Sequence, residues 1–176
     1  MAFTVEDGTG LPDANSYVDV DFADSYFQER GITAWTGGDE AKQAWLIQAT
    51  DYIEQVFAWR FVGVKMTEEQ GLAWPRRGAV SREGVQLTDG VMPVALLRAT
   101  CQYALRAVTG PLMPDPVVDA TGFAVVTTRK KVGPIEKEFR VMGSGGAPIL
   151  VRSYPAADGL LAGLLRQGAG GTRVIR

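Results

Sequence analysis

The chain has 176 residues, enough for about one domain with a sizeable buried core. It carries a formal net charge of −2, no histidine and a single cysteine, Cys101. These counts exclude a disulfide within the chain, histidine-ligated zinc or iron, and nucleophilic mechanisms that pair serine or cysteine with histidine. The composition therefore predicts a protein that is not an enzyme and that uses no metal or cofactor.

The charges are unevenly distributed along the sequence. Residues 1–60 contain eleven acids and three bases, a sum of −8, whereas residues 61–176 contain nine acids and fifteen bases, a sum of +6. Such a chain suits head-to-tail contact between copies, or a partner that faces one end. The alternative is that folding mixes the two halves and the asymmetry disappears.

The N-terminal third is predicted to be an extended arm followed by two helices. Residues 1–15 are interrupted by turn-forming residues, which favours an extended arm. The first helix is predicted from about Asp19 to Arg30, with Gly31 as its stop. A longer helix is predicted from about residue 39 to residue 59, because apolar residues recur there at three-to-four spacing.

The middle of the chain is predicted to hold two further helices. Thr67-Glu-Glu-Gln70 resembles a capping box and predicts a short helix that Pro75 terminates. A polar, turn-rich loop follows as far as Gly90. Another helix is predicted from Pro93 to about Val108, and its apolar stripe includes Cys101, which we expect to be a buried small hydrophobe.

The pattern changes after residue 120. Two β-rich runs, residues 123–132 and 135–142, flank Gly133-Pro134 and predict a hairpin. A last short helix is predicted after Tyr154-Pro155. No signal peptide or membrane-spanning run is apparent, so a cytoplasmic setting without a membrane partner is expected.

These elements predict a mainly α fold. We expect a helical bundle of about four to five helices with a β-hairpin insertion and extended N- and C-terminal arms. The helical body would cover about residues 16–110 and 153–167 of one domain. The hairpin arm would cover about residues 121–143, and a flexible tail residues 168–176.

Two basic groups are candidate functional residues. Arg129, Lys130 and Lys131 face Lys137 across the predicted hairpin, and Arg76 and Arg77 follow Trp74 at a predicted helix end. Such charges could contact nucleic-acid phosphates in a DNA channel, or pair with a neighbouring subunit. The alternative for the second group is that Trp74 fills the core while the two arginines solvate the loop.

The C-terminal tail is the third candidate. Gly168, Gly170 and Gly171 form a predicted hinge, after which four strand-prone residues end the chain, Arg173, Val174, Ile175 and Arg176. Such a tail could add a strand to the edge of a partner's sheet. The alternative is an ordinary disordered terminus.

Several short motifs, spread over roughly residues 4–166, carry a family resemblance. They are Val5-Glu-Asp-Gly-Thr-Gly10, Ala14-Asn-Ser-Tyr-Val18, Ala23-Asp-Ser-Tyr-Phe27 with Arg30-Gly31, Ala49-Thr-Asp-Tyr-Ile-Glu54, Leu72-Ala-Trp-Pro-Arg76, Ala99-Thr-Cys101 and Lys131-Val-Gly-Pro134. Together they resemble the tailed-phage and prophage proteins called DnaT-like single-stranded-DNA-binding proteins. More broadly, they resemble the helical head–tail connector (adaptor) proteins of siphophage necks.

The two parts of this resemblance imply different functions. The DnaT-like name implies a replication accessory that binds single-stranded DNA. The connector likeness implies a homo-oligomeric ring, usually of twelve copies, which joins the portal of the DNA-filled head to the next neck or head-completion protein. Packaged DNA would pass through that ring, and the protein would reside in the neck of the virion after assembly in the host cytoplasm.

The residues themselves favour the connector at this stage. A single-stranded-DNA binder should show a basic groove with interleaved aromatic side chains. This chain is net acidic and its aromatics fall at helical core spacing. We therefore predict a structural neck subunit whose tail, residues 173–176, pairs with the portal, and we keep single-stranded-DNA binding as the alternative.

Overall fold

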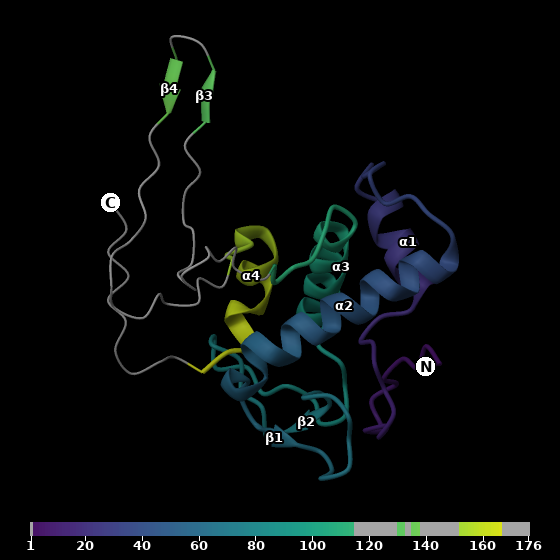
Figure 1. The fold of residues 1–176 in the computed structure, drawn as a ribbon. Helices are drawn as coiled ribbons and strands as arrows, with labels where there is room; N and C mark the ends of the chain where they lie inside the picture. The colour runs from purple at the N-terminus through teal and green to yellow at the C-terminus, as the bar shows by residue number, and fades with distance from the viewer. Residues whose placement is uncertain (1, 115–129, 133–134, 138–151, 167–176) are drawn as a thin grey trace. The chain divides into compact units, whose positions relative to one another are not determined.

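A computed structural model of the chain describes residues 2–114, 130–132, 135–137 and 152–166 (Figure 1). The chain divides into two compact units, Met1–Leu112 with Ser153–Arg176, and Met113–Arg152. The helices of the described residues are α1 (Val20–Gln28), α2 (Asp39–Phe57), α3 (Val94–Ala107) and α4 (Pro155–Leu161), with the 3-10 turns η1 (Ala58–Arg60) and η2 (Ala162–Leu164). The strands described are β1 (Val64–Lys65), β2 (Arg76–Arg77), β3 (Lys130–Val132) and β4 (Ile135–Lys137).

Local sequence signals explain where the predicted helices begin. The Asp19 carboxylate accepts a hydrogen bond from the Phe22 amide at 2.6 Å and caps α1. Asp39 and Glu40 lie in the first turn of α2, where negative charge stabilises the helix dipole. Pro93 precedes α3 directly. The predicted helices at about 19–30, 39–59 and 93–108 are thus confirmed to within two residues at each end.

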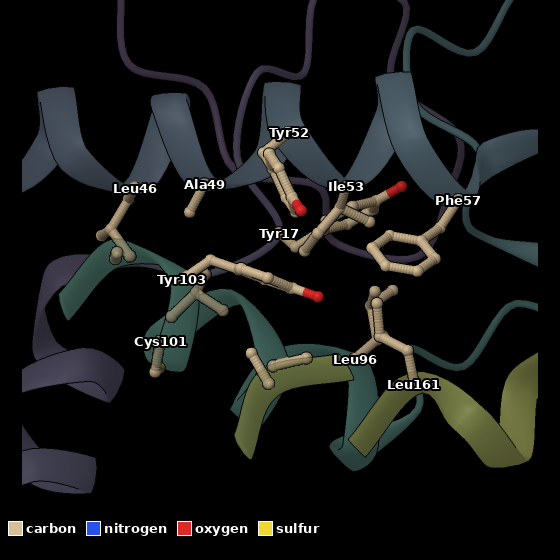
Figure 2. Close-up of a cluster of buried hydrophobic side chains, with 14 of the residues drawn as sticks. Tyr17, Leu46, Ala49, Tyr52, Ile53, Phe57, Leu96, Cys101, Tyr103 and Leu161 are labelled. Carbon is tan, nitrogen blue, oxygen red and sulfur yellow. The ribbon is translucent and has the colours of Figure 1, made fainter. Parts of the chain in front are cut away.

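The core of the first unit lies where α2, α3 and α4 pack together. Figure 2 shows Leu46, Ile53 and Phe57 of α2 pointing toward α3 and α4, and each of these side chains is buried. The α3 side chain of Tyr103 is fully buried, and its hydroxyl donates to Asp158 of α4 at 2.5 Å. Cys101 is also fully buried, as predicted, and burial raises its pKa to about 12.

The predicted N-terminal extended arm is wrong, because residues 2–18 fold back onto the unit. Val5 forms a parallel bridge with Ser16, and Tyr17 is buried in the core. The buried Glu6 carboxylate organises the loop. It accepts hydrogen bonds from the amides of Gly8 at 2.9 Å, Gly10 at 2.8 Å and Leu11 at 2.9 Å.

Replacing Glu6 with alanine should destabilise the fold by about 3 kcal/mol. Three loop amides would lose a charged acceptor, and each such bond contributes on the order of 1–3 kcal/mol. Urea unfolding of the two proteins measures the difference. Asp13→Ala, which removes an exposed acid from the same loop, is the matched control and should change stability by less than about 0.5 kcal/mol. Equal effects of the two substitutions would contradict this role of Glu6.

The predicted short helix after Thr67 is also wrong, although its capping box forms. The Thr67 amide donates to Gln70 Oε1 at 2.9 Å, and the Gln70 amide donates to Thr67 Oγ1 at 3.2 Å. The Gln70 side-chain amide then donates to the carbonyls of Leu72 and Pro75. Because these carbonyls are satisfied by a side chain, the segment continues as a series of bends rather than as a helix.

The predicted hairpin is confirmed where the structure describes the second unit. β3 and β4 pair antiparallel, with Lys130 opposite Lys137 and Val132 opposite Ile135. The remainder of the predicted arm, residues 121–129 and 138–143, lies outside the described residues. So do the predicted hinge and tail, residues 168–176.

The fold class is therefore mainly helical with a small hairpin. The described helices do not clearly form the predicted bundle of four to five helices, because a layer of loops and short strands, residues 58–93, forms one end of the first unit. No helix among the described residues is long and apolar enough to cross a membrane.

Candidate nucleic-acid interface

Three segments far apart in the sequence meet at the C-terminal end of α2. Phe61, just after η1, forms an antiparallel bridge with Leu165. The Arg166 amide donates to the Arg60 carbonyl at 2.7 Å, and the Arg82 amide donates to the Gly163 carbonyl at 2.9 Å. We call this region the basic end, and we define it by the exposed side chains of Trp59, Lys65, Arg77, Arg82 and Arg166 together with the half-buried Arg60.

Trp59 is the most exposed large hydrophobic side chain at this end, at 76 %. Its position follows from helical geometry. Phe57 and Phe61 are both buried, and a residue midway between two core positions four residues apart points to the opposite side of the chain. The Arg60 guanidinium carbon lies 5.8 Å from the centre of the Trp59 ring and 6.0 Å from that of Phe57. An exposed indole therefore stands beside a cation that is partly ordered by aromatic contacts.

Gly63 allows the two short strands of the basic end to approach each other. It has a φ of +74°, and a Cβ built there would lie 2.7 Å from the Arg77 carbonyl oxygen. β1 and β2 then pair antiparallel, with Val64 opposite Arg77 and Lys65 opposite Arg76. This pairing, which the sequence did not predict, brings Lys65 and Arg77 to the same end as Trp59.

The two adjacent candidate arginines have opposite environments. Arg76 is only 8 % exposed, and its guanidinium donates to the carbonyls of Val62 at 2.7 Å, Gly63 at 2.8 Å and Ala73 at 3.0 Å. Trp74 is fully buried and fills the core, as one of the two alternatives predicted, but the same alternative placed both arginines in solvent and is wrong for Arg76. Arg77 is exposed. Of the pair, Arg77 is therefore the one available to a ligand, whereas Arg76 holds the surrounding loops together.

A polar pair formed by the buried Tyr17 and by Glu54 lies close to Lys65 and Arg76. The Tyr17 hydroxyl donates a short hydrogen bond to Glu54 Oε1, and the Ala73 amide donates to Glu54 Oε2 at 3.0 Å. Burial raises the pKa of Glu54, although the bonds from Tyr17 and Ala73 and the charges of Lys65 and Arg76 oppose that shift. Burial, followed by the nearby Glu54 charge, raises the pKa of Tyr17 well above its usual value.

The raised pKa of Glu54 predicts a pH dependence of stability. Because the folded state favours the protonated carboxyl, this group's stabilising contribution is present below its unfolded pKa and is lost as the pH rises through the folded pKa. As the pH rises from 4 to 7, the unfolding free energy of the wild type should therefore fall relative to that of Glu54→Gln. Urea unfolding across this range measures it. A difference that stays constant or moves in favour of the wild type would contradict the assignment.

Four exposed acids occur in residues 58–93, the segment that carries most of the cations of the basic end. Glu68 and Glu69 belong to the turn whose Thr67 and Gln70 pack against Gly10 of the N-terminal loop. The Asp89 carboxylate accepts the Gly78 amide at 2.8 Å. Glu83 is exposed in the turn next to Arg82. The five cations of the basic end thus outnumber the acids that lie among them.

The other candidate residues belong to the second unit or lie outside the described residues. In the hairpin of the second unit, Lys130 is the register partner of Lys137, and Lys131 is the register partner of Glu136. Arg129 and the tail candidates Arg173, Val174, Ile175 and Arg176 lie outside the described residues, as do Gly168, Gly170 and Gly171. Among the described residues, no group of three or more acidic, cysteine or histidine side chains could hold a metal ion.

The main candidate residue that the sequence analysis did not single out is Trp59. It is the last residue of the helix predicted at about 39–59, and the aromatics as a group were expected at core spacing. Its position midway between Phe57 and Phe61 was the available signal. Arg60, Arg82 and Arg166 had no such signal, because only the folded chain brings their three segments together.

One comparison with known proteins gives a match. A family model described as "Putative DnaT-like ssDNA binding protein" matches residues 1–176. No curated protein and no solved structure gives a significant match to the chain.

Proposed function

We propose that this chain, which belongs to the DnaT-like ssDNA binding protein family, binds single-stranded DNA through its basic end. The observation that carries the proposal is the 76 % exposed Trp59 beside Arg60. A solvent-exposed indole presents a flat aromatic face on which a base can stack. The neighbouring cations are placed to neutralise phosphates of the same strand.

The arrangement favours a single strand over a duplex. Stacking on Trp59 requires a base whose face is free, and the bases of a duplex are already stacked on each other. The basic end is made of short strands and turns, and it projects no helix that could enter a major groove. Recognition by stacking and phosphate contact is also independent of base sequence.

A salt titration tests the proposal. Fluorescence anisotropy of a labelled dT oligonucleotide should report binding at low salt, with affinity falling linearly on a log–log plot as salt increases. If about four cations contact phosphates, the slope should be about −3, since single strands give roughly −0.7 per contact. A duplex of the same length should bind more weakly. Equal affinity for both, or no binding of the single strand at low salt, would contradict the proposal.

The phage-neck adaptor ring remains a second proposal, which the family match does not support. The observation that favours it is the separation of charge along α2. Asp39 and Glu40 lie in its first turn, and the acidic α1 packs against α2 through the Asp24–Lys42 ion pair of 2.7 Å. The basic end lies at the other end of this 19-residue helix, about 28 Å away.

Separated charges of this kind suit head-to-tail packing of copies into a ring, with the portal and the next neck protein as partners. Sedimentation velocity of the purified protein, alone and with portal rings, tests this second proposal. A defined oligomer that joins the portal would support it. A protein that stays monomeric and does not associate with portal rings would contradict it.

A further inference from the structure

Two arginine side chains from distant parts of the chain converge on one oxygen atom. Arg76 Nη2 donates to the Gly63 carbonyl at 2.8 Å, and Arg166 Nη2 donates to the same oxygen at 3.1 Å. Two guanidinium groups are therefore held close together without an intervening carboxylate. The charge of Arg166 contributes, after burial, to a lowered pKa of Arg76.

The two groups differ in how many of their donors are used. Arg76 is buried and donates to three carbonyls, so it has little capacity for a ligand. Arg166 is exposed, and its only side-chain hydrogen bond among the described residues is the one to Gly63. A guanidinium has five N–H donors, so most of those on Arg166 face solvent. No carboxylate in the described part of the chain forms an ion pair with it.

The backbone holds Arg166 beside the proposed stacking site. Its amide donates to the Arg60 carbonyl, and the preceding residue, Leu165, bridges to Phe61. The backbone of Arg166 is therefore anchored to Arg60, the residue that follows Trp59 in the sequence. An anchored guanidinium loses less conformational entropy on binding an anion than a free one does.

We infer that Arg166 binds the phosphate group next to the base that stacks on Trp59, with Arg60 beside it. This subsite rests on the proposed function. Its ligand is a phosphodiester of the bound strand, and the same chemistry would accept a free phosphate ion. An anion there relieves the repulsion between the two converging guanidinium groups, which is a gain that an isolated surface arginine lacks.

The test compares Arg166→Gln with Arg98→Gln, which removes an exposed arginine of α3 that is not among the residues of the basic end. In salt titrations of a dT oligonucleotide, Arg166→Gln should lower affinity about tenfold and make the slope shallower by about 0.7. Arg166→Lys should restore the slope but not the full affinity, because lysine keeps the charge and loses the planar fork. Arg98→Gln should match the wild type.

A second measurement separates the subsite from the proposed function. Inorganic phosphate should raise the melting temperature of the wild type above that in chloride of equal ionic strength, and Arg166→Gln should lose this difference. If the wild type binds the oligonucleotide but Arg166→Gln leaves the slope unchanged, the subsite is overturned and the function stands. If the phosphate effect depends on Arg166 but no oligonucleotide binds, the function fails and the anion site stands.

Discussion

Replacing Trp59 with alanine should weaken binding of a dT oligonucleotide roughly 5- to 150-fold, because one base–aromatic stack contributes about 1–3 kcal/mol. The substitution should leave stability nearly unchanged, since the indole is 76 % exposed and leaves no cavity in the core. Anisotropy titrations at one low salt concentration, together with urea unfolding, measure both quantities. A loss of affinity without a loss of stability would assign the effect to contact with the strand.

Trp59→Phe is the matched control for this prediction. Phenylalanine keeps an aromatic face at the same position and should retain most of the affinity. The slope of affinity against salt should be the same in wild type, Trp59→Ala and Trp59→Phe, because no cation is removed. Wild-type affinity in Trp59→Ala would show that the strand, if it binds, uses another surface.

Replacing Arg76 with methionine should destabilise the fold by about 3–5 kcal/mol. The substitution keeps the packing of the side-chain stem but removes three charged hydrogen bonds and leaves the carbonyls of Val62, Gly63 and Ala73 without this donor. For a chain of this size the melting temperature should fall by roughly 10 °C. Thermal unfolding followed by circular dichroism measures the shift.

Arg77→Met, one residue along the same strand, is the control. Its side chain is exposed, so its stability should stay within about 0.5 kcal/mol of the wild type. It should instead weaken oligonucleotide binding and make the salt slope shallower by about 0.7. Substitution of Arg76 is thus expected to change stability, and substitution of Arg77 is expected to change binding. A stability loss for Arg77→Met as large as that for Arg76→Met would contradict the assignment.

The helices could be predicted from the sequence because their signals are local. The Asp19 cap, the acids in the first turn of α2 and Pro93 before α3 each act within a few residues, and apolar spacing marks the buried faces. The hairpin was predictable for the same reason, since Gly133-Pro134 separates two β-rich runs. Its pairing of Val132 with Ile135 needs no distant partner.

The errors arose where hydrogen bonds of a polar side chain decide the course of the backbone, because apolar spacing does not reveal such bonds. Glu6 turns a predicted arm into a folded loop, because its carboxylate binds three loop amides at once. Gln70 satisfies the carbonyls of Leu72 and Pro75 and so replaces the predicted helix. Arg76 was predicted as a solvent-facing charge because its carbonyl partners Val62 and Gly63 lie more than ten residues away.

The measurement that tests the central claim most directly is the intrinsic tryptophan fluorescence of the protein during titration with unlabelled dT oligonucleotide. Of the four tryptophans, Trp35 and Trp74 are buried and Trp45 is half-buried with its ring centre 5.4 Å from that of Trp35, so a base stacking on the exposed Trp59 should dominate any quenching. The wild type should be quenched to saturation at low salt, and Trp59→Phe should bind with little quenching. Quenching of equal size in both proteins, or binding that leaves wild-type fluorescence unchanged, would show that Trp59 does not contact the strand.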